Sequence, residues 1–355
     1  MKALVLSGGT GTRLRPHSYS TPKQLVPVAN KPVLFHGLEA IRNAGIVDVG
    51  IVVNTPGAAI RAAVGDGSSF GMNITYLSQD EPLGLAHCVV IAKEFLGGDD
   101  FLMYLGDNVF SEGLDEPLAE FIEHRPAAQL AVTKVSDPSQ YGIVDVDAAG
   151  RVTSLQEKPA HPASDLAITG LYFFTPQIHD AVHSIKPSWR NELEITDAIQ
   201  WLVEQGCEVR AMLVPGYWKD TGTHADLLEC NKILLQGITP DVCGHADAFT
   251  IITGPVIVAA DARLERSEIV GPAIIGAGST VVASHVGPFT SIGRGCRVID
   301  AEVADSILLD RASVRGVRTI RDSIIGKAGD IRRGDPGSAV HRLIVGDDST
   351  IEIPA

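Results

Sequence analysis

The sequence is poor in cysteine and in aromatic residues, and it has no long apolar run. Its five cysteines are odd in number and form no Cys-x-x-Cys pair. This argues against a disulfide framework or a structural zinc site and favours reduced thiols in a cytoplasmic protein. No apolar segment approaches the roughly 20 residues that a membrane-spanning helix needs, and the first apolar run is too short for a signal peptide. We therefore expect a cytoplasmic protein with no membrane partner.

Basic residues are the scarcer charge. Lysine and arginine together number 29 against 43 aspartates and glutamates, which gives a formal net charge of −14. General nucleic-acid binding needs a basic surface, so we expect no nucleic-acid partner. A phosphorylated small molecule stays compatible with this charge, because a local basic loop and a divalent cation can override the global field.

The first part of the chain, residues 1–236, alternates strand-like and helix-like patterns. Such alternation predicts crossover units and a mixed, mostly parallel sheet covered on both faces, which is a Rossmann-like α/β domain. Later strands in this part look antiparallel or mixed. The expected strands are Ala3–Leu6, Val49–Val53, Ile74–Leu77, Phe101–Leu105, Gly142–Asp147, Arg151–Gln156, Ala167–Phe174 and Arg210–Val214, and the expected helices are Pro32–Ala44, Gly84–Leu96 and Glu194–Gln205.

Residues 237–355 have a different character, with few aromatic residues and no helical pattern. Small residues and Val or Ile recur instead, and aliphatic or threonine positions stand six apart at Ile274, Thr280, Val286, Ile292 and Val298. A six-residue repeat is typical of the coils of a left-handed parallel β-helix. We predict a second, β-helix-like domain here, with a short β-sandwich as the alternative.

A glycine-rich loop directly follows the first expected strand, in the segment Leu6-Ser7-Gly8-Gly9-Thr10-Gly11-Thr12-Arg13. Glycines allow the backbone to approach a ligand and to turn its amides toward an anion. Arg13 and Lys23 add positive charge at the loop. The segment is neither a P-loop nor a dinucleotide fingerprint, because GxxxxGK[ST] and the third glycine of GxGxxG are absent.

Two aspartates follow expected strands in the segments Gly106-Asp107-Asn108 and Lys219-Asp220-Thr221. Ligands bind at the carboxyl edge of open parallel sheets, and Mg²⁺ prefers a few hard oxygen ligands together with phosphate oxygens. Either aspartate alone would be read as a turn or cap residue. Together with the glycine loop, Asp107 and Asp220 predict a Mg²⁺ site.

A fourth polar element is Glu157-Lys158-Pro159, where Lys158 could bind a sugar phosphate and Glu157 could accept hydrogen bonds from sugar hydroxyls. Without the other motifs, a solvated Glu–Lys pair at the end of a strand would explain it as well. The histidines have no spaced acidic or cysteine partners that would suggest a metal or nucleophilic role.

These motifs, in this order, resemble the sugar-nucleotide pyrophosphorylase family, and within it the long-form glucose-1-phosphate thymidylyltransferases. The resemblance covers almost all of residues 1–236, and the tail resembles that of the long subfamily, which feeds deoxysugar pathways, including antibiotic biosynthesis. The matching segments are Gly8–Leu14, Pro22–Leu25, Leu105–Asn108, Tyr141–Gly142, Glu157–Pro159, Thr169–Tyr172, Glu192–Asp197 and Asp220–Gly222.

The resemblance implies a role for each matching residue. The nucleotide site would comprise Leu6, Gly8, Gly9, Thr10, Gly11, Thr12, Arg13, Gln79, Gly84 and Asp107. Gln79 would read the pyrimidine edge with help from the Gly84 backbone. The sugar-phosphate site would comprise Gly142, Glu157, Lys158, Thr169, Gly170 and Tyr172. Arg13, Lys23, Asp107 and Lys158 would act in catalysis, and Asp107 and Asp220 would hold Mg²⁺.

The implied reaction joins dTTP and glucose 1-phosphate to give dTDP-glucose and pyrophosphate. Leu83 stands where relatives often carry a polar residue or arginine, which leaves the choice between thymidine and uridine nucleotides open. An exposed aliphatic face of a β-helix commonly packs against a second copy, so we also expect a homo-oligomer.

Two other functions stay open at this point. The first is a bifunctional uridylyltransferase whose tail also acetylates a sugar amine, although the tail is short and shows no evident catalytic histidine. The second is an inactive regulatory subunit that only binds sugar nucleotides. An inactive subunit would be free to lose active-site residues. This chain keeps all of them: Arg13, Lys23, Asp107, Lys158 and Asp220.

Overall fold

A computed structural model describes residues 1–9, 11–54, 57–214 and 216–334 of the chain. Over these residues the chain forms two compact units. The first draws on Met1–Thr10 and Val33–Asp220, and the second on Gly11–Pro32 and Thr221–Ala355. The predicted domain boundary after residue 236 stays a prediction. No helix in the described part of the chain is long and apolar enough to cross a membrane.

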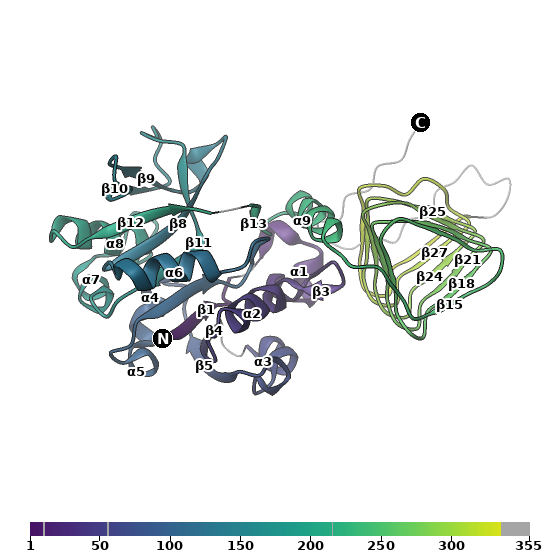
Figure 1. Cartoon of the computed structure of the whole chain (residues 1–355), viewed down its shortest axis with the longest axis horizontal. Coiled ribbons are helices and arrows are strands. Elements are labelled where there is room, and N and C mark those ends of the chain that lie inside the picture. The colour runs from purple at the N-terminus through teal and green to yellow at the C-terminus, as the bar shows by residue number, and fades with distance from the viewer. Residues whose placement is uncertain (10, 55–56, 215, 335–355) are drawn as a thin grey trace. The chain divides into compact units, whose positions relative to one another are not determined.

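The first unit is built on a nine-stranded sheet in the order β10-β9-β11-β6-β1-β4-β5, with β8 paired to β11 and β12 (Figure 1). A separate two-stranded ladder joins β7 and β13. The strands are β1 (Lys2–Leu6), β4 (Asp48–Asn54), β5 (Asn73–Gln79), β6 (Phe101–Leu105), β7 (Asn108–Phe110), β8 (Ala128–Lys134), β9 (Gly142–Val146), β10 (Val152–Glu157), β11 (Leu166–Phe174), β12 (Val209–Leu213) and β13 (Trp218–Asp220).

This sheet is mixed, as the sequence predicts. Strands β6, β1, β4 and β5 run parallel, whereas β11 is antiparallel to β6, β8 and β9, and β9 is antiparallel to β10. The central β1 is almost wholly apolar and buried from Ala3 to Leu6. Strands buried on both faces read as continuous apolar runs, and this explains why the sequence locates them well.

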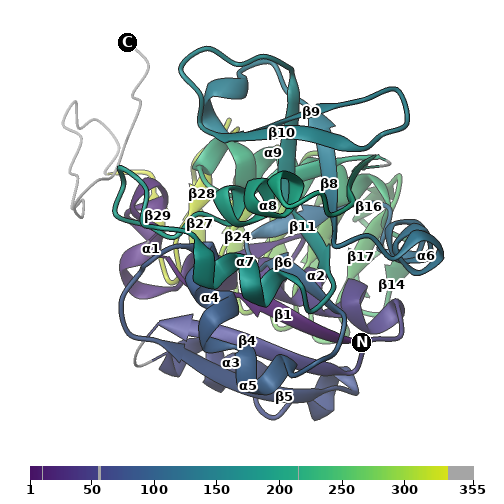
Figure 2. The same ribbon diagram turned by 90° about the vertical axis from the view of Figure 1, so that its left-hand side faces the viewer.

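Helices of the first unit cover the sheet (Figure 2). In α2, the residues Val33, Leu34, Leu38 and Ile41 are fully buried at helical spacing. The single helix predicted over Gly84–Leu96 is instead two short helices that meet at Ala92. The helices are α2 (Val33–Asn43), α3 (Ala58–Val64), α4 (Leu85–Ile91), α5 (Lys93–Leu96), α6 (Asp115–His124), α7 (Ile178–Ser184) and α8 (Ile195–Glu204), with 3₁₀ turns η3 (Ser68–Phe70) and η4 (Pro138–Gln140).

The second unit begins with short elements: η1 (Thr12–Leu14), α1 (His17–Ser20), η2 (Lys23–Leu25), β2 (Pro27–Val28), β3 (Lys31–Pro32) and the longer α9 (His224–Gln236). The start of α9 is fixed by a capping box. The Thr223 hydroxyl accepts from the Asp226 amide, and the Asp226 carboxylate accepts from the Thr223 amide. Two backbone donors that the helix leaves open are thereby satisfied.

The rest of the second unit is a stack of short parallel strands in three sheets (Figure 1). This confirms the β-helix-like tail and excludes the β-sandwich, whose sheets would be antiparallel. The strands are β14 (Asp241–Val242), β15 (His245–Ala246), β16 (Ile251–Thr253), β17 (Val256–Val258), β18 (Arg263–Glu265), β19 (Glu268–Val270), β20 (Ala273–Ile275), β21 (Thr280–Val282), β22 (His285–Val286), β23 (Thr290–Ile292), β24 (Arg297–Ile299), β25 (Glu302–Val303), β26 (Ile307–Leu308), β27 (Ser313–Arg315), β28 (Ile324–Ile325) and β29 (Asp330–Arg332).

The repeat differs in detail from the predicted six-residue spacing. Val281 pairs with Val298, which is 17 residues further on, so that one coil is shorter than three steps of six. The inward residue is therefore Val281, fully buried, and Thr280 is only half-buried. Around such a coil two steps of six residues are combined with one of five, and this accounts for the ragged register in the sequence.

Candidate nucleotide and sugar-phosphate site

Four parallel strands of the first unit bring polar side chains to one edge of the sheet. Asn54 ends β4 and Gln79 ends β5, and the two are register partners. Leu6 ends β1, and Asp107 follows β6 after one intervening glycine. The carboxyl edge of an open parallel sheet is where such folds bind ligands. The predicted nucleotide-site residues of this unit therefore lie together at that edge.

The glycine loop leaves β1 at the same edge. A Cβ atom on Gly8 would lie 2.9 Å from Asn54 Oδ1, so a side chain there would displace the Asn54 amide. Gly9 and Gly11 have φ values of 101° and 59°, a backbone conformation that side chains disfavour. Thr10, which the sequence analysis also placed in the nucleotide site, lies outside the described residues.

Arg13 and Lys23 belong to the second unit. Gly11 lies against the start of the Lys23 side chain, since a Cβ atom on Gly11 would be 3.2 Å from Lys23 Cβ. The Ser18 hydroxyl donates to the Gly11 carbonyl at 2.7 Å and closes this turn. Thr12 and Arg13 are exposed on η1. The loop thus presents the Arg13 charge to solvent, where an anion can reach it.

Gln79 is 6% exposed, and its amide is held by its own neighbours. Nε2 lies 3.4 Å from the Gly84 carbonyl oxygen and 3.1 Å from His87 Nδ1. His87 stands in the first turn of α4 and was not singled out by the sequence. Gly84 has a φ of 99°, and a Cβ atom there would collide with the Leu193 backbone.

The loop around Gly84 is joined to the segment before α8. The Leu193 amide donates to the Leu83 carbonyl at 2.8 Å, and the Ala86 amide donates to the Leu193 carbonyl at 3.0 Å. These two bonds connect the loop that carries Gln79's partner with the acidic residues on either side of Leu193. Backbone hydrogen bonds therefore join the segment around Gly84 to the segment around Leu193.

Asp220 ends β13, and Asp107 directly precedes β7, the strand that pairs with β13. Asp220 is the register partner of Asn108 in the β13–β7 ladder, and Asn108 Nδ2 donates to Asp107 Oδ1 at 2.9 Å. The Trp218 ring nitrogen donates to Asn108 Oδ1 at 2.6 Å and fixes that amide. Among the described residues there is no group of three or more His, Cys, Asp or Glu side chains that could hold a metal. Two carboxylates completed by substrate phosphates and water suit Mg²⁺, so the residues fit this ion.

Glu157 ends β10 opposite Gly142, the first residue of β9. A Cβ atom on Gly142 would lie 3.2 Å from Glu157 Oε2 and 2.8 Å from Thr196 Cγ2. The missing side chain of Gly142 therefore makes room for both residues. Thr196 donates its hydroxyl to Glu157 Oε2 at 3.3 Å.

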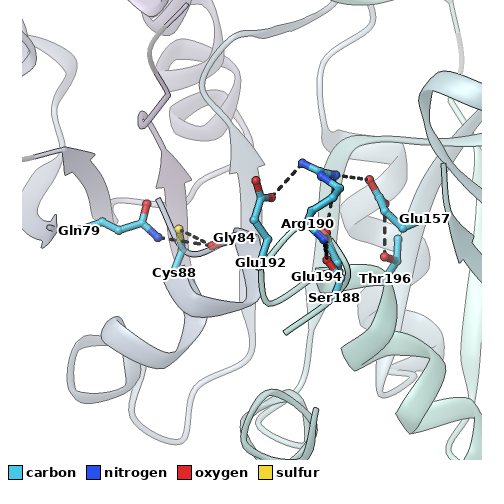
Figure 3. A network of polar contacts seen from close by, with 9 residues as sticks. All are labelled: Gln79, Gly84, Cys88, Glu157, Ser188, Arg190, Glu192, Glu194 and Thr196. Atoms are coloured by element: carbon cyan, nitrogen blue, oxygen red, sulfur yellow. Dashed lines mark hydrogen bonds and ion pairs between the residues drawn. The ribbon is translucent and has the colours of Figure 1, made fainter. Parts of the chain in front are cut away.

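Arg190 is the cation of this region, and the sequence analysis gave it no role. Its guanidinium contacts Glu157 at 3.3 Å, Glu192 at 2.9 Å and Glu194 at 3.6 Å, as Figure 3 shows. The Ser188 hydroxyl donates to Glu194 at 2.8 Å. The matching segment Glu192–Asp197 was the available signal, but only the fold places Arg190 beside Glu157, 33 residues away.

The pKa of the Glu157 carboxyl is raised, first because burial disfavours its charge and next because Glu194 repels it. Lys158 and Arg190 act in the opposite direction. Lys158 itself is exposed and has a φ of 44°, with its amide bonded to the Tyr141 carbonyl at 3.0 Å. This turn directs the chain sharply after Glu157.

Thr169 and Gly170 lie at an irregularity of β11. The pairing with β8 shifts between Ile168 and Tyr172, and bulges of this kind recur beside active sites. The Thr169 hydroxyl donates to the Ala131 carbonyl at 2.8 Å and is thus used within the sheet. A Cβ atom on Gly170 would meet Asn108 Oδ1 at 2.5 Å, so glycine lets β11 approach the Asp107 region.

Tyr172 is 4% exposed and packs in the core against Phe174, with ring centroids 5.9 Å apart. Burial raises the pKa of its hydroxyl, and the charge of Glu157 adds to the effect. Gly142 and Thr196 thus contact Glu157, whereas Thr169 bonds within the sheet, Gly170 lies against Asn108, and Tyr172 is buried in the core.

Comparison with known proteins agrees with this architecture. Residues 2–237 match the nucleotidyl transferase family. Glucose-1-phosphate thymidylyltransferases of Streptomyces antibioticus and Streptomyces griseus are 51% and 52% identical, and each alignment covers 99% of both chains. A Bacillus anthracis structure assigned as a glucose-1-phosphate thymidylyltransferase, with sucrose bound, superposes with a TM-score of 0.63 at 32% identity, over 68% of this chain and 98% of the other. The chain belongs to the glucose-1-phosphate thymidylyltransferase family of nucleotidyl transferases.

Proposed function

We propose that this protein makes dTDP-glucose and pyrophosphate from dTTP and glucose 1-phosphate in a Mg²⁺-dependent reaction. The observation that carries the proposal is the carboxyl edge of the sheet, where Gln79 ends β5, Asp107 follows β6, and the glycine loop leaves β1 between these two strands. The identity to two thymidylyltransferases over the whole chain supports the choice of substrates.

The reaction needs alignment more than proton transfer. An oxygen of the glucose 1-phosphate anion attacks the α-phosphorus of dTTP in line, the bond from that phosphorus to the bridging β-oxygen breaks, and pyrophosphate leaves. The nucleophile is already an anion, so no general base is needed. Arg13 and Lys23 would neutralise the leaving pyrophosphate, and Lys158 would hold the attacking phosphate.

Asp107 and Asp220 would hold the metal ion, and nucleotidyl transferases of this family generally use a divalent one. Bound Mg²⁺ would supply charge stabilisation on the reacting phosphates. The residues of this chain do the rest of the positioning. Asn108 orients the Asp107 carboxylate, and Trp218 in turn fixes Asn108.

Glucose would bind around Glu157. The carboxylate can accept hydrogen bonds from sugar hydroxyls, and Arg190 and Thr196 orient it. Gly142 and Gly170 let Thr196 and Asn108 pack closely against the backbone, where side chains would collide with them. Thr169 and Tyr172 would shape the site from within the sheet.

We place the reaction in the cytoplasm, upstream of deoxysugar biosynthesis, including antibiotic pathways. All five cysteines are free, which suits a reducing compartment. The β-helix-like tail would join copies of the chain into a homo-oligomer. The two alternative functions are not favoured, because the Streptomyces antibioticus and Streptomyces griseus relatives, which match over 99% of their length, are thymidylyltransferases.

The deciding experiment measures pyrophosphate release by the purified protein with Mg²⁺ across a panel of nucleoside triphosphates and sugar 1-phosphates. We expect dTTP with glucose 1-phosphate to give the highest kcat/KM. No release with any pair would overturn the proposal in favour of a regulatory subunit. Acetyl-CoA consumption with an amino-sugar phosphate would instead support the bifunctional enzyme.

A further inference from the structure

The orientation of the Gln79 side-chain amide follows from a neighbouring carbonyl oxygen, which can only accept a hydrogen bond from it. The Gly84 carbonyl oxygen, 3.4 Å from Nε2, has no proton to donate. The Cys88 thiol lies on the same side and donates to that carbonyl at 3.6 Å (Figure 3). The nitrogen side of the amide therefore faces α4, and its carbonyl faces the opposite way.

His87 completes this arrangement. Its Nδ1 lies 3.1 Å from Gln79 Nε2, and the amide nitrogen is a donor. Nδ1 therefore accepts this hydrogen bond, which requires the ring N–H to be on Nε2. Both N–H groups of the Gln79 amide then have acceptors within the chain.

The carbonyl oxygen of Gln79 is left to face the glycine loop. A Cβ atom on Gly8 would lie 3.6 Å from Gln79 Oε1 and 2.9 Å from Asn54 Oδ1. Two acceptor oxygens therefore lie beside Gly8, which has no side chain to cover them. A ligand bound beside Gly8 could donate hydrogen bonds to these two oxygens.

Gly84 cannot easily move away from Gln79. Its φ of 99° and the crowding against Leu193 fix the turn, and the Leu193 amide holds the preceding Leu83 carbonyl at 2.8 Å. His87 follows within the same helix turn as Gly84. The two acceptors that orient Gln79 are therefore held in place, the Gly84 carbonyl by the backbone turn and His87 by its position on α4.

We propose that His87 is a positioning residue that holds the Gln79 carbonyl toward the base, so that the site selects a pyrimidine presenting an N3–H donor over cytosine. Thymine and uracil carry a hydrogen on N3, which Gln79 Oε1 can accept. Cytosine presents a lone pair on N3, which Oε1 repels. This inference rests on the proposed function and names the base class that its nucleotide site reads.

The experiment compares wild type with His87→Leu and His87→Gln in assays with dTTP, UTP and dCTP and glucose 1-phosphate. Leucine removes the acceptor, whereas the glutamine carbonyl can replace it. We expect the dTTP/dCTP ratio of kcat/KM to fall about tenfold in His87→Leu, because a site built to pair a substrate N–H loses its orientation. The change should be in KM for dTTP, and His87→Gln should keep the ratio within about threefold of wild type.

A matched control is His183→Leu, which removes an exposed imidazole from the end of α7 in the same unit. Its ratio should equal that of wild type. A second measurement needs no variant: dTTP methylated at N3 has no hydrogen to donate, and wild type should use it at least tenfold less well than dTTP.

Three results separate the possibilities. An unchanged ratio in a folded His87→Leu protein overturns the role of His87. Equal use of dTTP and its N3-methyl analogue overturns the reading of N3–H, even if the variants do not fold. Wild type that releases no pyrophosphate from dTTP or UTP contradicts the proposed function itself, whatever the variants do.

Discussion

Asp220 lies opposite Asn108 in the antiparallel ladder of β13 and β7, and Asn108 donates its side-chain amide to Asp107 at 2.9 Å. Two aspartates more than a hundred residues apart in the sequence are thereby brought to adjacent positions. The ladder, rather than either turn alone, determines where the two carboxylates lie. Their proposed metal role can be tested by changing charge without changing shape.

Asp220→Asn keeps the side-chain volume and removes the charge. If Asp220 holds Mg²⁺, we expect a weaker apparent metal affinity and a kcat about 10²–10³ lower, since one preorganised contact to the reacting phosphates is worth that much. Raised Mg²⁺ should recover part of the loss. The measurement is kcat against Mg²⁺ concentration. Wild-type kcat and metal dependence would show that Asp220 is only a strand residue.

Arg13→Ala should behave differently. The exposed guanidinium on η1 is proposed to neutralise the leaving pyrophosphate, so its loss should lower kcat by about 10²–10³. Extra Mg²⁺ should not restore the rate, because the missing charge is not that of the ion. The same titration with Arg15→Ala, an exposed arginine two residues further on, serves as the control. Recovery of Arg13→Ala at high Mg²⁺ would contradict the assignment.

The sequence was sufficient for the buried parts of the fold. Strands β1 and β6 are apolar apart from Lys2, so their ends are predicted to within one residue, and the end of β6 gives the place of Asp107 at the carboxyl edge. The β-helix-like tail was recognisable from its repeat. Its register was not, because a coil of two six-residue steps and one five-residue step makes Val281 rather than Thr280 the inward residue.

Contacts between distant segments could not be predicted in this way. Arg190 is a single cation in a loop, and nothing in its neighbourhood of the sequence indicates Glu157 as a partner. His87 has no spaced acidic partner, and its contact with Gln79 follows from the fold around Gly84. The bulge at Thr169 could not be predicted from the apolar sequence of its strand either, because it arises from the pairing with β8.

Glu157 predicts a pH dependence for sugar binding. Folding raises the pKa of its carboxyl, so the protonated form favours the fold at low pH and this contribution is lost as pH rises through the raised pKa. Activity has the opposite requirement, because only the carboxylate accepts from hydroxyls on both oxygens and pairs with Arg190. We expect KM for glucose 1-phosphate to rise as pH falls, beginning above the usual glutamate range.

Glu157→Gln tests whether Glu157 causes the predicted rise in KM at low pH, which is the acid limb of the KM–pH profile. The amide cannot titrate, so KM should be higher at neutral pH and should no longer change on acidification. The check is a KM–pH profile for glucose 1-phosphate in both proteins. An acid limb of the same shape in Glu157→Gln would assign it to another group.

The tail predicts self-association. Phe249 and Ile251 are 76% and 61% exposed on the early coils, and apolar surface of this kind commonly packs against a second copy. Sedimentation should show a homo-oligomer, and the double variant Phe249→Ser, Ile251→Ser should weaken it. Trp189→Ser, which removes an 88% exposed apolar residue from the first unit, is the control. A monomer at every concentration would contradict this prediction.

Asn231 should be a large contributor to the stability of the second unit. It is fully buried in α9, where Oδ1 accepts from the Ala29 amide at 2.9 Å and from the Ser291 hydroxyl at 2.7 Å, and Nδ2 donates to the Phe289 carbonyl at 3.0 Å. Asn231→Ala leaves these buried partners unpaired, so we expect a loss of about 2–4 kcal/mol in the free energy of urea unfolding. Lys232→Ala, the next residue on the same helix, removes partly exposed ion pairs with Asp305 and Asp322 and should cost less than about 1 kcal/mol. If the two variants unfold at the same urea concentration, water replaces the lost amide, and Asn231 does not hold α9 to the coils.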